Sequence, residues 1–163
     1  MRPKTSEHSP LQQDFNEEDF RRIAKQDGVT HISTGVAVVK DGKLLLVRRA
    51  ASDYLGGNYE LPGGGVDANE SIVDSALREL QEETGLVASR VVGSFPGFDY
   101  KTDKKPHVRQ INFIVKVETN SIHLNPNEHD DYKWVTDQDT SLLNMSANMQ
   151  TCVQNATELI KRL

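Results

Sequence analysis

A group of glutamates in the stretch 64–86 is the part of this sequence whose residue types and spacing most directly suggest chemistry. Glu79, Glu82 and Glu83 stand at positions i, i+3 and i+4, so a helix would place their carboxylates on one strip of its surface. Like charges at this spacing repel each other, and a divalent cation with oxygen ligands would relieve the repulsion. The alternative is a solvated acidic face on which Arg78 pairs with Glu82.

Three glycines directly before this helix favour a cation site over a solvated face. Gly63, Gly64 and Gly65 lack side-chain bulk, so the backbone there can approach a phosphate group closely. Glu70 adds a further acid just ahead of the helix. The stretch therefore predicts acidic side chains that hold a cation beside a phosphate-binding loop.

The helix that must position these glutamates is defined by its ends. Ser71 can cap its N-terminus, with Asp74 three residues later, and Gly85 can end it. A second face has apolar spacing and is expected to be core; it carries Val73, Ala76, Leu77, Leu80 and Thr84.

The same stretch resembles the signature of the Nudix hydrolases, residue for residue and gap for gap. The family pattern is a glycine, five residues, a glutamate, seven residues, then Arg-Glu-aliphatic-any-Glu-Glu-any-Gly-aliphatic. The matching positions are Gly64, Glu70, Arg78, Glu79, Leu80, Glu82, Glu83, Gly85 and Leu86. The lead-in from Tyr59 to Gly65 is similar to the family's Trp-Glu-Leu-Pro-Gly-Gly-Gly, with tyrosine in place of tryptophan.

The resemblance implies a fold and a reaction. The fold is the α/β/α Nudix sandwich, an α/β architecture with a mixed β-sheet between helices, over residues 31–163. The reaction is hydrolysis of a pyrophosphate bond in a nucleoside diphosphate linked to another moiety. Mg²⁺ is the expected cofactor, and Mn²⁺ could substitute for it.

The resemblance also implies roles for the residues of the signature. Glu79 and Glu83 are the expected principal metal ligands, with Glu82 close behind. Arg78 is expected to orient a glutamate through a charge-assisted pair, and Glu70 to brace the loop and Arg78. Which glutamate acts as the general base stays open.

Candidate substrate contacts lie outside the signature. Arg49 ends an apolar strand and would either reach a phosphate or lie in solvent. Residues 96–110 are expected to form a long loop that selects the substrate. Its aromatics Phe98 and Tyr100 could stack on a nucleobase, while Arg109 and nearby lysines could hold phosphate. The alternative is a mobile loop with solvated side chains.

Two further acids have open roles. Glu60 would either pair with an arginine, which we favour, or contact the substrate. Glu128 opens an acidic loop, 128–131, before a short strand. In the Nudix family an acidic loop in this place often lies over the metal site and can supply a ligand or a base. A capped polar turn is the alternative.

The elements around the signature helix follow from periodicity. The N-terminal part divides into a flexible polar tail, 1–13, and a short helical segment, 14–30, which either docks on the domain, as we favour, or forms a lid or dimer arm. Strands are predicted at 31–39, 43–49, 87–95, 111–117 and 132–135. An amphipathic helix, 146–163, closes the chain with Cys152 on its inner side.

Composition narrows the functional class. A net charge of −5 over 163 residues argues against binding of a nucleic-acid polymer but is compatible with a small nucleotide substrate. No stretch is apolar and long enough to span a membrane, and the single cysteine fits a reducing compartment, so we expect a cytoplasmic protein. We expect it to be a monomer or a homodimer.

Our preferred hypothesis is that the protein is a nucleoside triphosphate pyrophosphatase. The second hypothesis is a hydrolase of ADP-ribose or of a dinucleoside polyphosphate, and the third is a nucleotide-binding module without catalytic activity.

Overall fold

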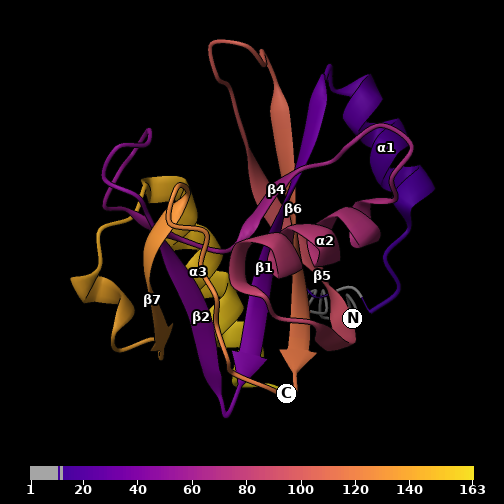
Figure 1. Ribbon diagram of the computed structural model, residues 1–163. Helices are drawn as coiled ribbons and strands as arrows, with labels where there is room; N and C mark the ends of the chain where they lie inside the picture. Colours follow the sequence, from indigo (N-terminus) through magenta and orange to yellow (C-terminus); the bar gives the residue numbers. More distant parts are fainter. Residues whose placement is uncertain (1–10, 12) are drawn as a thin grey trace, which may run out of the picture.

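A mixed β-sheet with helices on both faces forms the framework of the protein, as the resemblance implied (Figure 1). The computed structural model describes residue 11 and residues 13–163, so the expected flexible tail lies largely outside the described residues. The elements in chain order are α1 (Glu17–Gln26), β1 (His31–Lys40), β2 (Lys43–Arg49), β3 (Tyr59–Glu60), β4 (Gly63–Gly65), α2 (Ile72–Thr84), β5 (Ala88–Tyr100), β6 (Val108–Val117), β7 (His129–Val135), a 3₁₀ turn (Thr140–Leu142) and α3 (Ala147–Ile160).

The sheet divides where the glycine run enters it. The strand order is β3-β2-β1-β6-β5, with β1 and β6 parallel and β7 added beside β2. β1 pairs with β2 only at Val39 and Lys40, and Figure 1 shows the two strands diverging from that end. In the opened part β1 pairs instead with β4, so that Ser33, Thr34 and Gly35 lie opposite the three glycines. This split brings the start of the signature into the centre of the sheet.

Alternation along the central strands fills the cores on both faces of the sheet. Val36 and Val38 of β1 pack in one core with the apolar face of α2, whereas Ala37 and Val39 pack in the other with α3. Successive side chains of a strand point to opposite faces, so an unbroken apolar run suits a strand covered on both sides. The expected burial of 43–49 on both faces is confirmed for the same reason, because Leu45 faces α2 and its two leucine neighbours face α3.

The signature helix has the ends that its sequence predicts. The Ser71 hydroxyl accepts a hydrogen bond from the backbone N–H of Asp74 at 3.1 Å. Gly85 follows the last turn with φ of 76°, a left-handed conformation that suits glycine. Ala76 and Leu80 are fully buried, so α2 is anchored on the sheet through its apolar face.

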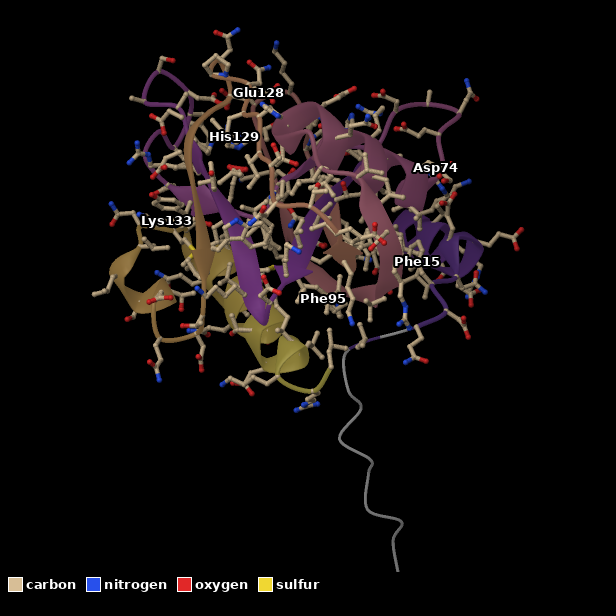
Figure 2. All side chains as sticks on the ribbon, turned by 60° about the horizontal axis from the view of Figure 1, so that its bottom comes forward. Phe15, Asp74, Phe95, Glu128, His129 and Lys133 are labelled. Atoms are coloured by element: carbon tan, nitrogen blue, oxygen red, sulfur yellow. The ribbon has the colours of Figure 1, made fainter. Side chains whose placement is uncertain are left out.

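The N-terminal helix packs against the same side of the sheet as α2. Asn16 caps it by accepting a hydrogen bond from the Asp19 N–H at 3.0 Å. The ring centroids of Phe15 and Phe20 are 5.7 Å apart, and Phe15 contacts Phe113 of β6 edge to face at 5.1 Å. In Figure 2 Phe15 lies far across the molecule from Glu128, so this part of the chain does not cover the Glu128 side.

The prediction that residues 96–110 form one long loop is wrong. β5 continues to Tyr100 and β6 begins at Val108, so the loop is confined to residues 101–107. Pro96 and Gly97 suggested a turn, but β5 is an edge strand, where a proline without an N–H is tolerated. A register shift between Pro96 and Asp99 accommodates the two residues within the β5–β6 pair.

The expected loop at 128–131 is also shorter than predicted. β7 begins at His129, and only Glu128 of this stretch precedes it. Arg48 pairs with Asp131 and Arg49 with His129, so β7 carries one extra residue at this point. Such a bulge changes the direction of the side chains beside it. Within residue 11 and residues 13–163, no helix is both long and apolar enough to cross a bilayer.

Candidate metal and nucleotide site

The glycine run lies against the carboxylates of α2. The Gly63 N–H donates a hydrogen bond to Glu83 Oε2 at 3.0 Å. A Cβ atom on Gly63 would collide with the Thr34 carbonyl group, and one on Gly64 would lie only 2.6 Å from Glu79 Cδ. Gly63 is therefore required because the Thr34 backbone approaches it closely, whereas a side chain on Gly64 would have to displace the Glu79 carboxylate.

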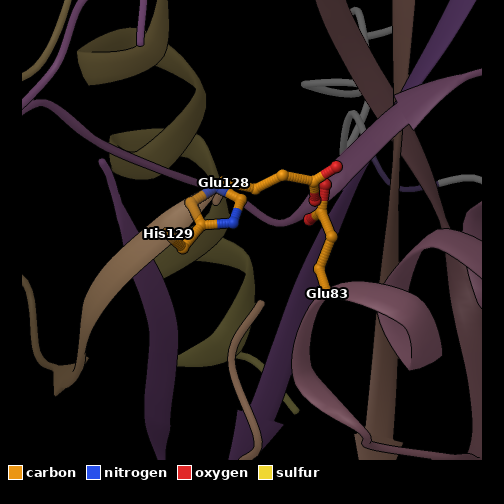
Figure 3. A group of neighbouring side chains, drawn as sticks. All are labelled: Glu83, Glu128 and His129. Carbon is orange, nitrogen blue, oxygen red and sulfur yellow. The ribbon is translucent and has the colours of Figure 1, made fainter. Parts of the chain in front are cut away.

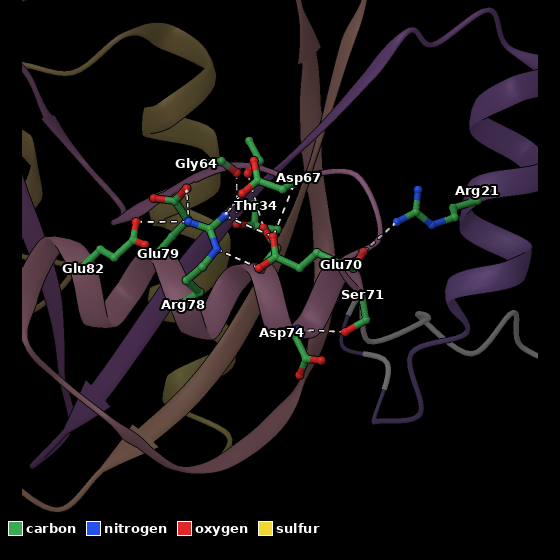
Figure 4. Close-up of polar contacts among 12 residues, drawn as sticks. Arg21, Thr34, Gly64, Asp67, Glu70, Ser71, Asp74, Arg78, Glu79 and Glu82 are labelled. Atoms are coloured by element: carbon green, nitrogen blue, oxygen red, sulfur yellow. Dashed lines mark hydrogen bonds and ion pairs between the residues drawn. The ribbon is translucent and has the colours of Figure 1, made fainter.

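Arg78 forms ion pairs with several glutamates in and beside the acidic strip (Figure 4). Its guanidinium donates to both carboxylate oxygens of Glu70, at 2.7 and 3.0 Å, and to Glu79 and Glu82 at 3.2 and 3.0 Å. The bidentate bond from Arg78 lowers the pKa of Glu70 to about 2 and raises the pKa of Arg78 itself. Glu70 also accepts from the Asp67 N–H at 3.3 Å, so it links the loop before α2 to the arginine.

Glu83 differs from the other glutamates of the strip because it is buried. Its exposed fraction is 6%, whereas 59% of the Glu82 side chain is exposed. Burial raises the pKa of Glu83 to about 9, and the negative charges of Glu60, Glu79 and Glu128 act in the same direction. Burial likewise raises the pKa of Glu79. A cation beside these carboxylates would favour their ionised forms.

Glu83, Glu128 and His129 meet at the edge between α2 and β7 (Figure 3). One ligand atom from each lies within 4.8 Å of the others. The backbone of Glu128 is held in place because its carbonyl accepts from the Ala50 N–H at 2.9 Å, while its side chain is exposed. Sequence reasoning missed His129, because residues 128–131 were expected to form a loop and His129 belongs to no motif.

The donor set fits a divalent cation. It offers carboxylate oxygens from Glu83 and Glu128, with Glu79 close enough to affect the Glu83 pKa, and oxygen donors suit hard cations. The Nδ1 atom of His129 is buried and has no hydrogen-bond partner among the described residues. A bound cation would relieve the repulsion between the carboxylates of Glu83 and Glu128, and it could also give the His129 ring nitrogen a partner.

A cavity of about 430 Å³ opens beside the glycine run. Gly63 and Gly64 line it, together with Arg49, Phe98 and Tyr100 from the predicted substrate contacts. The aromatic rings have centroids 5.7 Å apart, and Tyr100 donates from its hydroxyl to Ser33 Oγ at 3.2 Å. Gly65 does not line the cavity. The structure therefore brings two aromatic faces and the glycine backbone to one space, with the aromatics on a strand.

The two candidate arginines are already paired. Arg49 donates to Glu60 Oε1 and Asp53 Oδ2, both at 2.9 Å, so the expected pairing of Glu60 with an arginine is observed. Arg109 donates to Asp99 and Asp27, both at 2.8 Å. It lines a separate cavity of about 380 Å³ between α1 and β5, away from the glycine run.

The fold and the site together define a class of protein. It is an α/β/α sandwich in which the helix after a glycine-rich strand carries carboxylates beside a cavity. The model of the NUDIX domain matches residues 29–155. The chain belongs to this family.

Individual relatives agree with this assignment. The chain is 38% identical over 82 residues to the ADP-ribose pyrophosphatase of Methanocaldococcus jannaschii, covering 49% of this chain and 47% of that protein. It is 39% identical over 56 residues to the 8-oxo-dGTP diphosphatase of Proteus vulgaris, covering 34% and 50%. The chain thus spans about half the length of these curated relatives. The solved MutT NUDIX hydrolase from Burkholderia pseudomallei shares the fold, with a TM-score of 0.67 at 22% identity over 77% of this chain and 96% of that one.

Proposed function

We propose that this protein is a metal-dependent hydrolase that cleaves a pyrophosphate bond in a nucleoside diphosphate linked to another moiety. The observation that carries the proposal is the buried Glu83, which is crowded by other carboxylates at the glycine run. A buried, uncompensated acid is unfavourable unless a bound cation accompanies it in the working state. The neighbouring cavity supplies room for a nucleotide.

The residues of the site divide into holding, orienting and binding roles. Glu83, Glu79 and Glu128 would hold Mg²⁺, or Mn²⁺ in its place. Glu82, at the exposed edge of the strip, would be a further ligand. A bound cation of this kind neutralises phosphate oxygens and acidifies a coordinated water. Arg78 orients Glu79 and Glu82, and the Arg78–Glu70 pair fixes the loop between β4 and α2.

The substrate we propose is a nucleoside triphosphate. The rings of Phe98 and Tyr100 offer flat faces for a base, and Gly63 and Gly64 offer backbone for the phosphates in the same cavity. The 8-oxo-dGTP diphosphatase of Proteus vulgaris, one of the relatives, supports this choice. ADP-ribose is the second candidate, because the Methanocaldococcus jannaschii relative is named for it. The single cysteine, which is buried, supports a reducing compartment such as the cytoplasm.

A nucleotide panel with Mg²⁺ tests the proposal. Nucleoside triphosphates, ADP-ribose and a dinucleoside polyphosphate would be incubated in ¹⁸O-labelled water, and the products followed by ³¹P NMR. We expect metal-dependent cleavage with ¹⁸O in one phosphate product and the fastest rate for a triphosphate. Fastest cleavage of ADP-ribose would transfer the assignment to the second candidate. Nucleotide binding without cleavage of any panel member would make the protein a binding module and overturn the proposed hydrolase.

A further inference from the structure

His129 has the position of a metal ligand but belongs to no part of the Nudix signature. It is the first residue of β7, its backbone pairs with Arg49 of β2, and only 4% of its surface is exposed. A ring nitrogen lies within 4.8 Å of carboxylate oxygens of both Glu83 and Glu128. Figure 3 shows the ring and the two carboxylates pointing toward one another.

The two nitrogens of this ring have different surroundings. Nδ1 is buried and has no hydrogen-bond partner among the described residues. Nε2 lies 3.9 Å from Glu60 Oε2, and Glu60 in turn accepts from Arg49 at 2.9 Å. Buried polar atoms in folded proteins are almost always satisfied, so the unpartnered nitrogen needs an occupant that the protein itself does not supply.

This arrangement is typical of imidazole that binds a metal. A metal-bound histidine generally has a carboxylate near its second nitrogen, and that carboxylate sets the orientation and tautomer of the ring. Glu60, held by Arg49, lies on that side of the ring, with its Oε2 atom 3.9 Å from Nε2 and thus beyond hydrogen-bonding distance. Glu128 lies in the turn before β7, so strand alternation does not direct its side chain away from that of His129.

We propose that His129 is a nitrogen ligand of the divalent cation, which makes this a mixed carboxylate–imidazole site. The proposal rests on the proposed function, because the cation is the one that Glu83 and Glu128 would hold. Imidazole is a poorer ligand for Mg²⁺ than oxygen is, but a good one for Co²⁺ and other later transition metals. His129 is thus expected to raise the affinity for these metals relative to Mg²⁺. The competing explanation is that His129 only donates a hydrogen bond to a carboxylate and never touches the cation.

Electron spin echo envelope modulation on the Mn²⁺-loaded full chain distinguishes these explanations. A nitrogen bound directly to Mn²⁺ modulates the echo at ¹⁴N frequencies, and incorporation of ¹⁵N-histidine changes the pattern without altering the protein. We expect ¹⁴N modulation in the unsubstituted chain, a ¹⁵N pattern after labelling, and loss of the signal in His129→Gln. His31→Gln is the matched control, because His31 is exposed and lies outside the cluster, and it should keep the signal.

Metal titration gives a second measurement with its own outcome. Isothermal titration calorimetry of His129→Gln should show Co²⁺ affinity reduced about tenfold or more and Mg²⁺ affinity reduced less than about threefold. Equal losses for the two metals would overturn the ligand role.

The outcomes separate this inference from the proposed function. Mn²⁺ bound without histidine nitrogen modulation would overturn the ligand role of His129 and leave the hydrolase proposal standing. The same holds if His129→Gln keeps the signal. Failure of the unsubstituted chain to bind Mn²⁺ or Mg²⁺ at all would overturn the proposed function itself. If His129→Gln does not fold, the isotope experiment still decides, because His129 is the one histidine in the acidic cluster of the described residues.

Discussion

Arg109 and Arg78 each pair with several carboxylates, and the regions around these two arginines differ in whether the charges balance. Arg109 pairs with Asp99 and Asp27, and His107 Nε2 also lies 2.6 Å from Asp99. Hydrogen bonds from Arg109 lower the pKa of Asp99 to about 2, so the acid is well stabilised by groups already present. This ion-pair group needs no further partner.

The region around Arg78 has more acid than base. Arg78 contacts Glu70, Glu79, Glu82 and Asp67, and its bidentate bond to Glu70 lowers the pKa of that one carboxyl group to about 2. The pKa values of Glu79 and Glu83 are raised, chiefly by burial. A balanced group stabilises structure, whereas an unbalanced and partly buried one has the electrostatic character of a ligand site.

The largest expected effect is that of Glu83→Gln. Glutamine keeps the size and can still accept the Gly63 N–H, but it removes the charge at the centre of the unbalanced group. We expect turnover with Mg²⁺ to fall about 1000-fold, with the far-UV circular dichroism spectrum unchanged. Near-wild-type turnover would remove Glu83 from the metal site.

A matched pair of substitutions compares the two arginines directly. Lysine cannot reproduce the bidentate bond to Glu70, so Arg78→Lys should reduce kcat/KM about 10- to 100-fold. Arg109→Lys should reduce it less than about threefold and lower the free energy of unfolding by about 1 kcal/mol. Steady-state kinetics and urea denaturation measure both. An equal loss of activity in the two variants would contradict a functional difference between the regions around Arg78 and Arg109.

The glycine run offers a second matched pair. A Cβ on Gly64 would lie 2.6 Å from Glu79 Cδ, whereas one on Gly65 would meet only Lys105 Nζ at 3.6 Å. Gly64→Ala should therefore displace the Glu79 carboxylate and weaken Mg²⁺ binding about tenfold, with Gly65→Ala within about threefold of the wild type. Calorimetric titration checks both values. Equal affinities in the two variants would contradict the prediction that Gly64 keeps the Glu79 carboxylate in place for the cation.

Substitution of the aromatic pair separates substrate choice from metal binding. The double variant Phe98→Ala, Tyr100→Ala removes two cavity walls and leaves every carboxylate of the site in place. We expect relative rates across the nucleotide panel to change about fivefold to tenfold, with Mg²⁺ dependence intact, because stacking on a base contributes at this scale. If the ranking of substrates is unchanged, another surface of the protein must determine substrate specificity.

The smallest effect is on the pH dependence of stability without metal. The folded pKa of Glu83, about 9, lies above that of an exposed glutamate, so the folded state retains a proton that the unfolded state releases. This contribution is fully present below about pH 4 and is lost as pH rises toward 9. Urea unfolding of the wild type and of Glu83→Gln should thus show a difference in unfolding free energy that changes with pH over this window. A constant difference would argue against the raised pKa.

Local patterns accounted for a large part of the framework. The ends of α2, the cap of α1, the strands at 31–39 and 43–49 and the C-terminal helix follow from capping residues and periodicity, both of which act over a few residues. The extension of β5 to Tyr100 did not follow, because an edge strand tolerates proline and glycine that otherwise indicate a turn. The pairing of His107 with Asp99 likewise depends on strand register.

The sequence by itself determined that Glu79, Glu82 and Glu83 share one strip of a helix, since helical geometry follows from spacing alone. Only the tertiary structure decided which of them is buried. Glu83 faces the glycine strand while Glu82 remains exposed, because α2 lies on the sheet through its neighbouring apolar face. Tertiary structure alone also brought His129 to Glu83, since the pairing of β7 with β2 joins segments far apart in the chain, whereas Glu128 was already a candidate from the family resemblance.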